Sequence, residues 1–429
     1  MGGGLLQLVA YGAQDAYITG NPQITFWKSL FKRHTNFAME PFRVNFSGQS
    51  QWGTKQTAII GRHADLLYST YIQVELPQVD KNNVAYNWNN DQGSLGFNLI
   101  KWVEIDIGGQ VIDRLYGEWM YVWSSLSKPT DQRTKLTALL SKDCATTGST
   151  TLNNAPGCGS TGRQRSPNIF YIPLEFFYTK NPGAALPLIA LQYHEVKINI
   201  YWNDVEFLAG DFSVNTAGNG LANLPVASSA AIYIDYIYLD TEERRRMAQA
   251  SHEYLIEQTQ FNEDKGIVGS NSRIDLTFNH PVKELVWVVQ PSFYRDCSLM
   301  TGASAGTRLT PFLYNSDPIN EQWIQINGQD RLDKRYGNYF SRVQSYQHHS
   351  GVSAGVGAYS YSFALKPEEN QPSGTCNFSR IDTATIVMDF GDSNVNKTPD
   401  ALNWDVRVYA VNYNILRVMS GMGGLAFSN

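Results

Sequence analysis

Cysteine is scarce in this sequence. Four occur among 429 residues (Cys144, Cys158, Cys297 and Cys376), and no two form a Cys-x-x-Cys pair. This scarcity argues against a disulfide-dense secreted scaffold and against a zinc ribbon. We expect reduced thiols in a cytosolic assembly setting, with a bridge between Cys144 and Cys158 as the alternative.

Long apolar runs and an excess of positive charge are also missing. No stretch approaches the roughly 18 apolar residues that span a bilayer, and MGGGLLQLVA lacks the basic start of a secretory signal. Charged residues make up only 17%, with a net charge of -5, so the chain lacks the basic surface that nucleic acid requires and we expect no specific nucleic-acid partner. A hydrophobic content of 42% excludes general disorder.

Aromatic residues and glycine are abundant. Aromatics make up 13% of the chain and glycine occurs 35 times, which is typical of sheets joined by many turns. Apolar and polar residues alternate with period two in both halves, for example in 103–107, 196–202, 274–278 and 404–408. Such alternation predicts strands with one face on a core and the other face polar, so we expect an all-β protein.

Two segments of the chain resemble each other. EIDIGGQVIDRLYG (104–117) and IQINGQDRLDKRYG (324–337) share the order I-x-I-x-G-Q, then arginine, then Tyr-Gly, with one residue inserted in the second. Their offset is close to half the chain length. The repeat predicts one strand-turn unit in each of two similar β domains.

A polar stretch near the middle interrupts the β pattern. Asp240 followed by Glu243 resembles a capping box, and 240–258 lacks glycine and proline, so we expect a helical linker there. We therefore divide the chain into an N-terminal arm (1–24), a first sandwich (25–239), the helical linker (240–258) and a second sandwich (259–429).

Motifs for catalysis, metals and cofactors are incomplete. His194-Glu195 and His252-Glu253 both lack the second histidine of a zinc-binding HExxH site. No phosphate-binding loop occurs, and we expect no catalytic residues, no metal and no cofactor. N-x-S/T sequons stand at Asn45, Asn377 and Asn396, of which Asn45 and Asn396 are the candidate glycosylation sites.

Five blocks of sequence resemble one known family. They are GAQDAYITGNPQITFWKSLFKRHTNFAME (12–40), LPLIALQYHEVKI (186–198), YLDTEERRRMAQASHEYLIEQ (238–258), SFALKPEENQPSGTCNFSRID (362–382) and NYNILRVMSGMGGLAFSN (412–429). In this order they resemble the major capsid proteins of the large nucleocytoplasmic icosahedral DNA viruses, especially those of algae. The blocks run from one end of the chain to the other.

This resemblance implies a double jelly roll: two eight-stranded antiparallel β-sandwiches side by side, with short helices in loops and linker. It further implies a structural protein whose homotrimers form pseudo-hexagonal capsomers that tile the outer capsid shell of the virion, assembled in the host cytoplasm. The implied partners are neighbouring capsomers, minor capsid proteins and an inner viral membrane, with covalent glycans as a modification.

One N-terminal segment has the composition of a docking element. Its apolar and basic residues are Phe26, Trp27, Lys28, Leu30, Phe31, Lys32 and Arg33. This amphipathic mix fits contact with minor capsid proteins or a membrane at the inner face of the shell. The alternative is a helix or strand packed on the chain's own first sandwich.

Two other functions fit parts of the sequence. A β-sandwich glycoside hydrolase would use paired acids such as Asp330 and Asp333, and a host-glycan-binding attachment protein would use exposed loops and some of the 10 tryptophans. The hydrolase requires a cleft with two acids at catalytic spacing. The attachment protein requires exposed aromatic residues in a shallow groove.

Overall fold

The computed structural model describes residues 2–48, 51–76, 87–88, 95–140, 168–204, 209–210, 229–268, 271–292, 317–351, 357–390 and 403–427. The chain divides into two units, Met1–Asn36 and Phe37–Asn429. We call them the arm and the body. The arm in this sense runs to Asn36 and contains Phe26 to Arg33.

The arm contains two short helices, α1 (Gly3–Val9) and α2 (Asp15–Thr19). Neither helix has a buried residue, and every described residue of the arm is exposed. Among the described residues, no helix is both long and apolar enough to cross a membrane.

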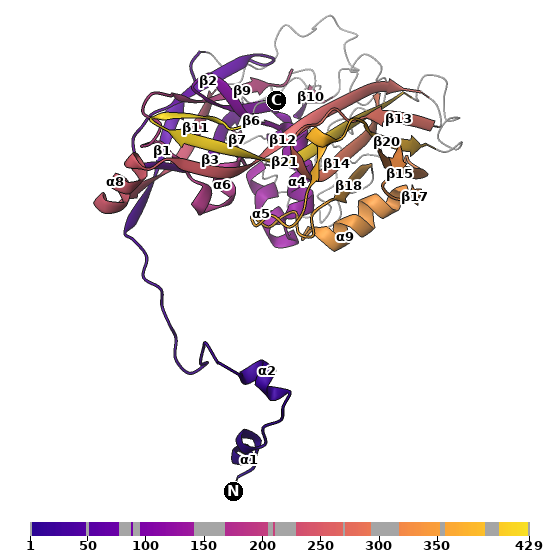
Figure 1. The fold of residues 1–429 in the computed structure, drawn as a ribbon. Helices are drawn as coiled ribbons and strands as arrows, with labels where there is room; N and C mark the ends of the chain where they lie inside the picture. Colours follow the sequence, from indigo (N-terminus) through magenta and orange to yellow (C-terminus); the bar gives the residue numbers. More distant parts are fainter. Residues whose placement is uncertain are drawn as a thin grey trace, which may run out of the picture. The chain divides into compact units, whose positions relative to one another are not determined.

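The first half of the body forms a sandwich of one five-stranded and one four-stranded sheet (Figure 1). Sheet 1a has the order β1 (Phe37–Asn45), β11 (Ser229–Leu239), β3 (Leu66–Leu76), β7 (Asn168–Pro173), with β8 (Leu186–Pro187) also on β3. Sheet 1b has the order β2 (Lys55–Ile60), β9 (Val196–Trp202), β5 (Ile100–Ile107), β6 (Gln110–Tyr116). A two-stranded ladder joins β4 (Asn87–Trp88) to β10 (Ala209–Gly210).

The second half repeats this arrangement. Sheet 2a has the order β12 (His252–Ile267), β21 (Trp404–Met419), β14 (Pro281–Pro291), β18 (Ala358–Ser362), with β19 (Cys376–Asn377) on β14 and β22 (Met422–Leu425) on β21. Sheet 2b has the order β13 (Asn271–Asp275), β20 (Ala384–Asp389), β15 (Glu321–Ile326), β16 (Gln329–Asp330), with β17 (Arg335–Tyr336) also on β15.

The two sandwiches share one strand order. Each sandwich has eight main strands when the short β4, β8, β10, β19 and β22 are left out. In each, one sheet has the order first, eighth, third, sixth, and the other has the order second, seventh, fourth, fifth. β16 and β17 together take the fifth position in the second sandwich. All of the strand pairs are antiparallel, which is the topology of a jelly roll. The predicted all-β fold with two sandwiches is confirmed.

The internal repeat corresponds to the same hairpin in both jelly rolls. β5 and β6 turn through Gly108 and Gly109, and β15 and β16 turn through Asn327 and Gly328. All four residues have positive φ, between 50° and 89°, as two-residue hairpins of the primed type require. The repeat therefore encodes a turn geometry as well as a strand pattern.

The Tyr-Gly pair that ends each repeat begins a helical segment. In the first jelly roll Gly117 opens α4 (Gly117–Ser127), and a Cβ there would lie 2.2 Å from the carbonyl oxygen of Ile100. In the second, Gly337 precedes the π-helical η7 (Tyr339–Val343) and α9 (Gln344–His348), and a Cβ would lie 2.5 Å from the carbonyl oxygen of Ile319. Both glycines allow the helical segment to lie directly against the backbone at the start of β5 in the first jelly roll and just before β15 in the second.

The predicted helical linker is only half helical. α8 (Thr241–Gln249) begins after Asp240, whose side chain accepts a hydrogen bond from the Thr241 amide. The assignment of helix to residues 252–258 is wrong, because β12 begins at His252 and pairs with β21 from Val418 onward. Pairing with this 16-residue strand overrides the local helix propensity.

The polar face predicted for 404–408 is buried. Asp405 and Arg407 are as buried as their apolar neighbours, and β14 is buried along nearly its whole length. One face of sheet 2a packs on the core of the second jelly roll, which includes Trp287 and Val406. The other face contributes Val286 and Val411 to the core of the first jelly roll. Sheet 2a thus lies between two cores.

Short helices and turns complete the body. They are α3 (Leu95–Asn98), α5 (Thr130–Leu140), α6 (Phe177–Lys180), η2 (Pro182–Ala184) and η8 (Phe378–Arg380). Figure 1 shows α4 and α5 between the two jelly rolls.

Candidate functional site

The junction between the jelly rolls is built around an aromatic cluster. Tyr116, at the end of β6, lies 4.5 Å from Phe261 of β12 and 6.0 Å from Tyr409 of β21, measured between ring centroids. Trp119 of α4 lies 5.2 Å from the Tyr409 ring. Aromatic pairs at these separations add to the stabilisation from buried apolar area. The cluster therefore fixes α4 and β6 of the first jelly roll on the outer face of sheet 2a.

A buried charge pair lies beside this cluster. The guanidinium of Arg407 donates two hydrogen bonds of 2.6 Å to the carboxylate of Glu118 in α4, and the Tyr409 hydroxyl donates a third of 2.7 Å. Arg407 also donates to the side-chain oxygen of Gln290. Burial opposes the charged form of Arg407, but Glu118 outweighs it and raises the pKa of the guanidinium. Glu118 thus stabilises the charged form of the buried guanidinium.

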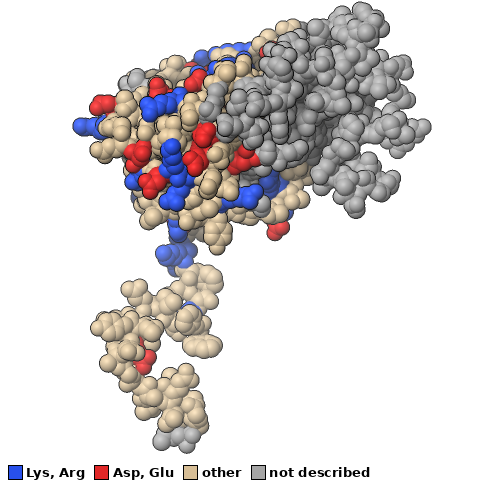
Figure 2. Space-filling model, turned by 90° about the vertical axis from the view of Figure 1, so that its right-hand side faces the viewer, with Lys and Arg blue, Asp and Glu red and all other residues tan. Residues whose placement is uncertain are grey.

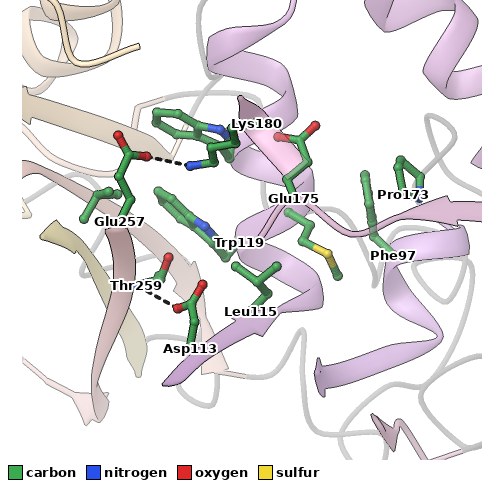
Figure 3. Close-up of a pocket in the computed structure, with 12 residues that line it drawn as sticks. Phe97, Asp113, Leu115, Trp119, Pro173, Glu175, Lys180, Glu257 and Thr259 are labelled. Carbon is green, nitrogen blue, oxygen red and sulfur yellow. Dashed lines mark hydrogen bonds and ion pairs between the residues drawn. The ribbon is translucent and has the colours of Figure 1, made fainter. Parts of the chain in front are cut away.

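A pocket opens at the same junction (Figure 3). Trp119 and Trp123 of α4 form one wall, and Glu257 and Thr259 of β12 form the opposite one. The Thr259 amide donates a hydrogen bond of 3.1 Å to Asp113 of β6. These contacts join the jelly rolls from within the pocket.

Glu257 binds two lysines from different parts of the body. Lys180 of α6 approaches its Oε2 at 2.8 Å and keeps 32% of its side chain exposed, whereas Lys283 of β14 is buried against Oε1. Burial raises the pKa of Glu257, but the two ammonium groups outweigh it and lower that pKa to about 2. Burial raises the pKa of Asp113 to about 6. Two of the carboxylates that line the pocket therefore differ: the pKa of Glu257 is held far below that of Asp113.

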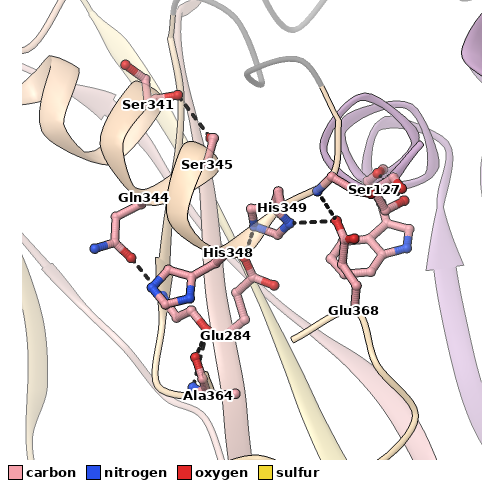
Figure 4. Close-up of polar contacts among 12 residues, drawn as sticks. Ser127, Glu284, Ser341, Gln344, Ser345, His348, His349, Ala364 and Glu368 are labelled. Carbon is pink, nitrogen blue, oxygen red and sulfur yellow. Dashed lines mark hydrogen bonds and ion pairs between the residues drawn. The ribbon is translucent and has the colours of Figure 1, made fainter. Parts of the chain in front are cut away.

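A second polar cluster centres on His349, just after α9 (Figure 4). Its Nε2 lies 2.5 Å from Glu284 of β14, and its Nδ1 lies 3.2 Å from Glu368. Burial disfavours the imidazolium, but the two carboxylates outweigh it and raise the pKa of His349 to about 10. The same ring packs edge-on against Trp123 of α4, 6.1 Å away. The next two residues continue the contact, because Ser350 and Gly351 donate hydrogen bonds to the carbonyls at the end of α4.

The C-terminal hairpin contacts the first jelly roll. Ser420 and Gly421 form its tight turn, and both have positive φ. The Tyr193 amide donates a hydrogen bond of 2.9 Å to the Gly421 carbonyl. His194 forms a 2.9 Å contact through Nδ1 with the Gly423 carbonyl, so this histidine packs against the C-terminal hairpin.

The predicted docking residues are strongly exposed. Trp27 and Phe31 show 95% and 92% of their surface, and Phe26 and Leu30 are similarly open. Residues 26–33 form neither helix nor strand, which does not support the alternative of a packed helix or strand. Lys28, Lys32 and Arg33 occur in the same stretch, and the only acidic residue of the arm is Asp15. Figure 2 shows an arm with few charges and a body face on which both signs are interspersed.

The other predicted positions lie apart from one another. Asn45 is exposed at the end of β1, opposite Ala231. Asn396 lies outside the described residues, as do Cys144, Cys158 and Cys297. Cys376 is a free thiol in β19. The third sequon asparagine, Asn377, uses its side-chain oxygen to cap η8.

The two acids named for a hydrolase are exposed. Asp330 accepts a hydrogen bond from Gln325 in an exposed turn, and Asp333 is exposed nearby. Within the described ranges, no group of three or more His, Cys, Asp and Glu side chains is placed to bind a metal ion. Glu118, Glu257 and Glu284, the carboxylates brought together at the junction, are engaged by cationic side chains instead.

Two jelly rolls of one strand order, joined through a buried polar and aromatic junction, define a double jelly-roll protein. Family models agree with this division: "Major capsid protein N-terminus" matches residues 25–240, and "Large eukaryotic DNA virus major capsid protein" matches residues 243–424. The major capsid protein of Pyramimonas orientalis virus is 43% identical over 100% of both chains.

Solved structures of capsid proteins also match this chain over most of its length. PBCV-1 VP54, in a crystal structure fitted into a reconstruction of the virophage Sputnik, has a TM-score of 0.76 at 34% identity over 94% of this chain and 100% of that one. A quasi-atomic model of the PBCV-1 virus capsid has a TM-score of 0.73 at 34% identity, with the same coverage. The chain belongs to the family of major capsid proteins of large eukaryotic DNA viruses.

Proposed function

We propose that this chain is the repeating structural subunit of an icosahedral virion shell, and that three copies associate into a pseudo-hexagonal capsomer. The observation that carries the proposal is the shared strand order of its two jelly rolls. Three such chains present six similar sandwiches around one axis, and can occupy a near-sixfold lattice position. The chain then acts by assembly rather than by turnover, without a cofactor.

The shell requires two kinds of contact. Contacts within the capsomer are obligate and should bury about 2,000 Å² or more of largely apolar surface. Contacts between capsomers should be more polar and individually weak, because repetition around the shell supplies the total stability. Assembly takes place in the host cytoplasm, before the shell closes.

The arm is the element that we assign to the inner face. Phe26, Trp27, Leu30 and Phe31 expose apolar surface next to Lys28, Lys32 and Arg33. Such a segment gains contact area when it meets a minor capsid protein, and its cations add attraction when the partner is an anionic membrane. Flotation with anionic vesicles, compared between the full chain and a chain lacking 2–36, tests whether the arm binds a membrane. Co-purification with the minor capsid proteins, again compared between the two chains, tests whether the arm binds those proteins instead.

Glycans are a further expected addition to the outer shell. Asn45 and Asn396 are the sequon positions that we assign to them, and Asn45 is exposed. Intact-mass measurement of virion protein, before and after replacement of each asparagine by glutamine, tests the assignment. A mass equal to that of the bare chain contradicts it.

Native mass spectrometry of the purified full-length chain tests the main proposal. It predicts a species of three times the chain mass of 48.1 kDa at micromolar concentration. A stable monomer at the highest soluble concentration contradicts the capsomer. Turnover of a polysaccharide by this chain would favour the hydrolase, and specific sugar binding by the free chain would favour the attachment protein.

A further inference from the structure

The junction inside the chain shows how one jelly roll covers another. The outer face of sheet 2a is covered by the end of β6 and by α4 of the first jelly roll. Tyr116 and Glu118 supply the first jelly roll's side of the contact, and Phe261 and Arg407 supply the sheet's side. The contact therefore joins two surfaces of different kinds: a sheet face and a strand-helix segment.

Each of these surfaces has an equivalent elsewhere in the chain. Sheet 1a has the same strand order as sheet 2a, and the segment β17-η7-α9 follows the second copy of the repeat as β6-α4 follows the first. Gly117 and Gly337 press against equivalent backbone carbonyls, which places both helical segments in the same way on their own jelly rolls.

In the described part of one chain, the sheet surface is half-buried and the surface of the helical segment is exposed. On sheet 1a, Tyr71 stacks on its cross-strand neighbour Tyr233 at 5.4 Å and lies 6.1 Å from Tyr171, which is 39% exposed. On the helical segment, Tyr346 is 89% exposed and Val343 is also exposed. A row of tyrosines across three adjacent strands is a face suited to burial against another apolar surface.

The charges on the two surfaces allow one ion pair across the contact. In the internal junction the helix supplies the carboxylate, Glu118, and the sheet supplies the cation, Arg407. On sheet 1a, the half-buried Asp235 lies two residues after Tyr233 in β11, and the exposed Arg43 of β1 lies directly opposite Tyr233. The helical segment carries the exposed Arg342, and its pairing with Asp235 favours docking of the segment at this part of the sheet.

We propose that the outer face of sheet 1a, around Tyr71, Tyr171, Tyr233 and Asp235, binds the η7-α9 segment of a second copy of this chain through Arg342, Val343 and Tyr346. The inference rests on the proposed capsomer and names the contact that closes it. The contact is heterologous, because each copy gives its sheet to one neighbour and its helical segment to the other, and such contacts close into a ring when the rotation allows. In a closed ring of three copies, a contact similar to the internal junction also forms between each pair of neighbouring chains. First and second jelly rolls then alternate around the axis.

Two sets of variants test the contact by native mass spectrometry. The sheet variant combines Tyr171→Glu with Asp235→Arg, and the helix variant combines Arg342→Glu with Tyr346→Glu. We expect each to lower the trimer fraction at least tenfold, with far-ultraviolet circular dichroism unchanged. A matched control, Lys55→Glu with Lys101→Glu on the exposed face of sheet 1b, should remain trimeric.

Mixing the two defective variants gives the sharpest result. The helix variant keeps an intact sheet and the sheet variant keeps an intact helical segment, so together they form one good contact and yield a species of two chains. If a variant loses its fold, the milder pair Tyr171→Ser and Arg342→Gln replaces it. Trimers that persist in a folded variant, or a mixture that stays monomeric, overturn the inference while a trimeric wild type leaves the capsomer intact. A monomeric wild type contradicts the capsomer itself.

Discussion

Glu118 and Arg407 are 289 positions apart in the sequence and form a two-bonded ion pair in the body. Glu118 is the second residue of α4 in the first jelly roll, and Arg407 lies in β21 of the second. The pair joins the two halves of the duplicated chain at their shared junction. Because the Arg407 side chain is only 1% exposed, removal of Glu118 would leave the guanidinium charge buried where water cannot solvate it.

Breaking this pair should be costly. Arg407→Met should lower the free energy of unfolding by about 3–5 kcal/mol, because it leaves the Glu118 carboxylate without its counter-charge at the buried junction. The double variant Glu118→Gln with Arg407→Met should lose clearly less than the sum of the two single variants. Urea unfolding of the four proteins checks this. Additive losses would contradict a direct coupling.

The stability of the body should fall as the pH rises above neutral. The pKa of His349 in the folded chain is raised to about 10, from an ordinary value near 6.5. The stabilisation from its imidazolium is therefore complete below about pH 6.5 and is lost as the pH rises toward 10, with a slope of up to about 1.4 kcal/mol per pH unit. Urea midpoints between pH 6 and pH 10 measure it.

Variants isolate the contribution of this histidine. His349→Gln should be less stable at pH 6 and show a flatter pH dependence than the wild type. The neighbouring His348, whose Nδ1 contacts only a backbone carbonyl in this cluster, provides the control. His348→Gln should keep the wild-type slope, and an unchanged slope in His349→Gln would refute the assignment.

The two repeat glycines should be equally sensitive to a methyl group. Alanine at Gly117 or Gly337 would place a Cβ within 2.5 Å of a backbone carbonyl oxygen. Each substitution should cost on the order of 1–3 kcal/mol, because the helical segment must move. Gly183, where a Cβ would meet nothing closer than 3.5 Å, is the matched control and should tolerate alanine. Thermal melts compare the three, and a neutral Gly337→Ala would argue against the structural equivalence of the repeats.

The two chain ends should behave in opposite ways. Truncation after Met419 removes β22 and its contacts with His194, and should lower the melting temperature by several degrees. Removal of residues 2–36 should leave the melting temperature unchanged, because every described residue of that segment is exposed. Calorimetry of the two truncated chains checks both outcomes, and a destabilised arm deletion would show that the arm packs on a fold.

Local patterns in the sequence predicted the elements more accurately than their environments. The alternation at 404–408 predicted a strand, but not that Asp405 and Arg407 are buried. A period of two shows which residues share a face of the sheet, but it does not show whether another domain covers that face. The hairpin repeat could be recognised because turn residues with positive φ leave a local signature. Glu118 and Asp113 were missed because each meets its partner across the junction, and His349 was missed because Glu284 and Glu368 are 65 and 19 positions away in the sequence. No spacing in the sequence reveals such contacts.

Averaged electron-microscope images of the purified protein test the central claim most directly. The account predicts particles with six lobes of similar size around a threefold axis, because three chains each contribute two jelly rolls of one topology. Particles with three lobes, or open chains without a closed ring, would contradict it.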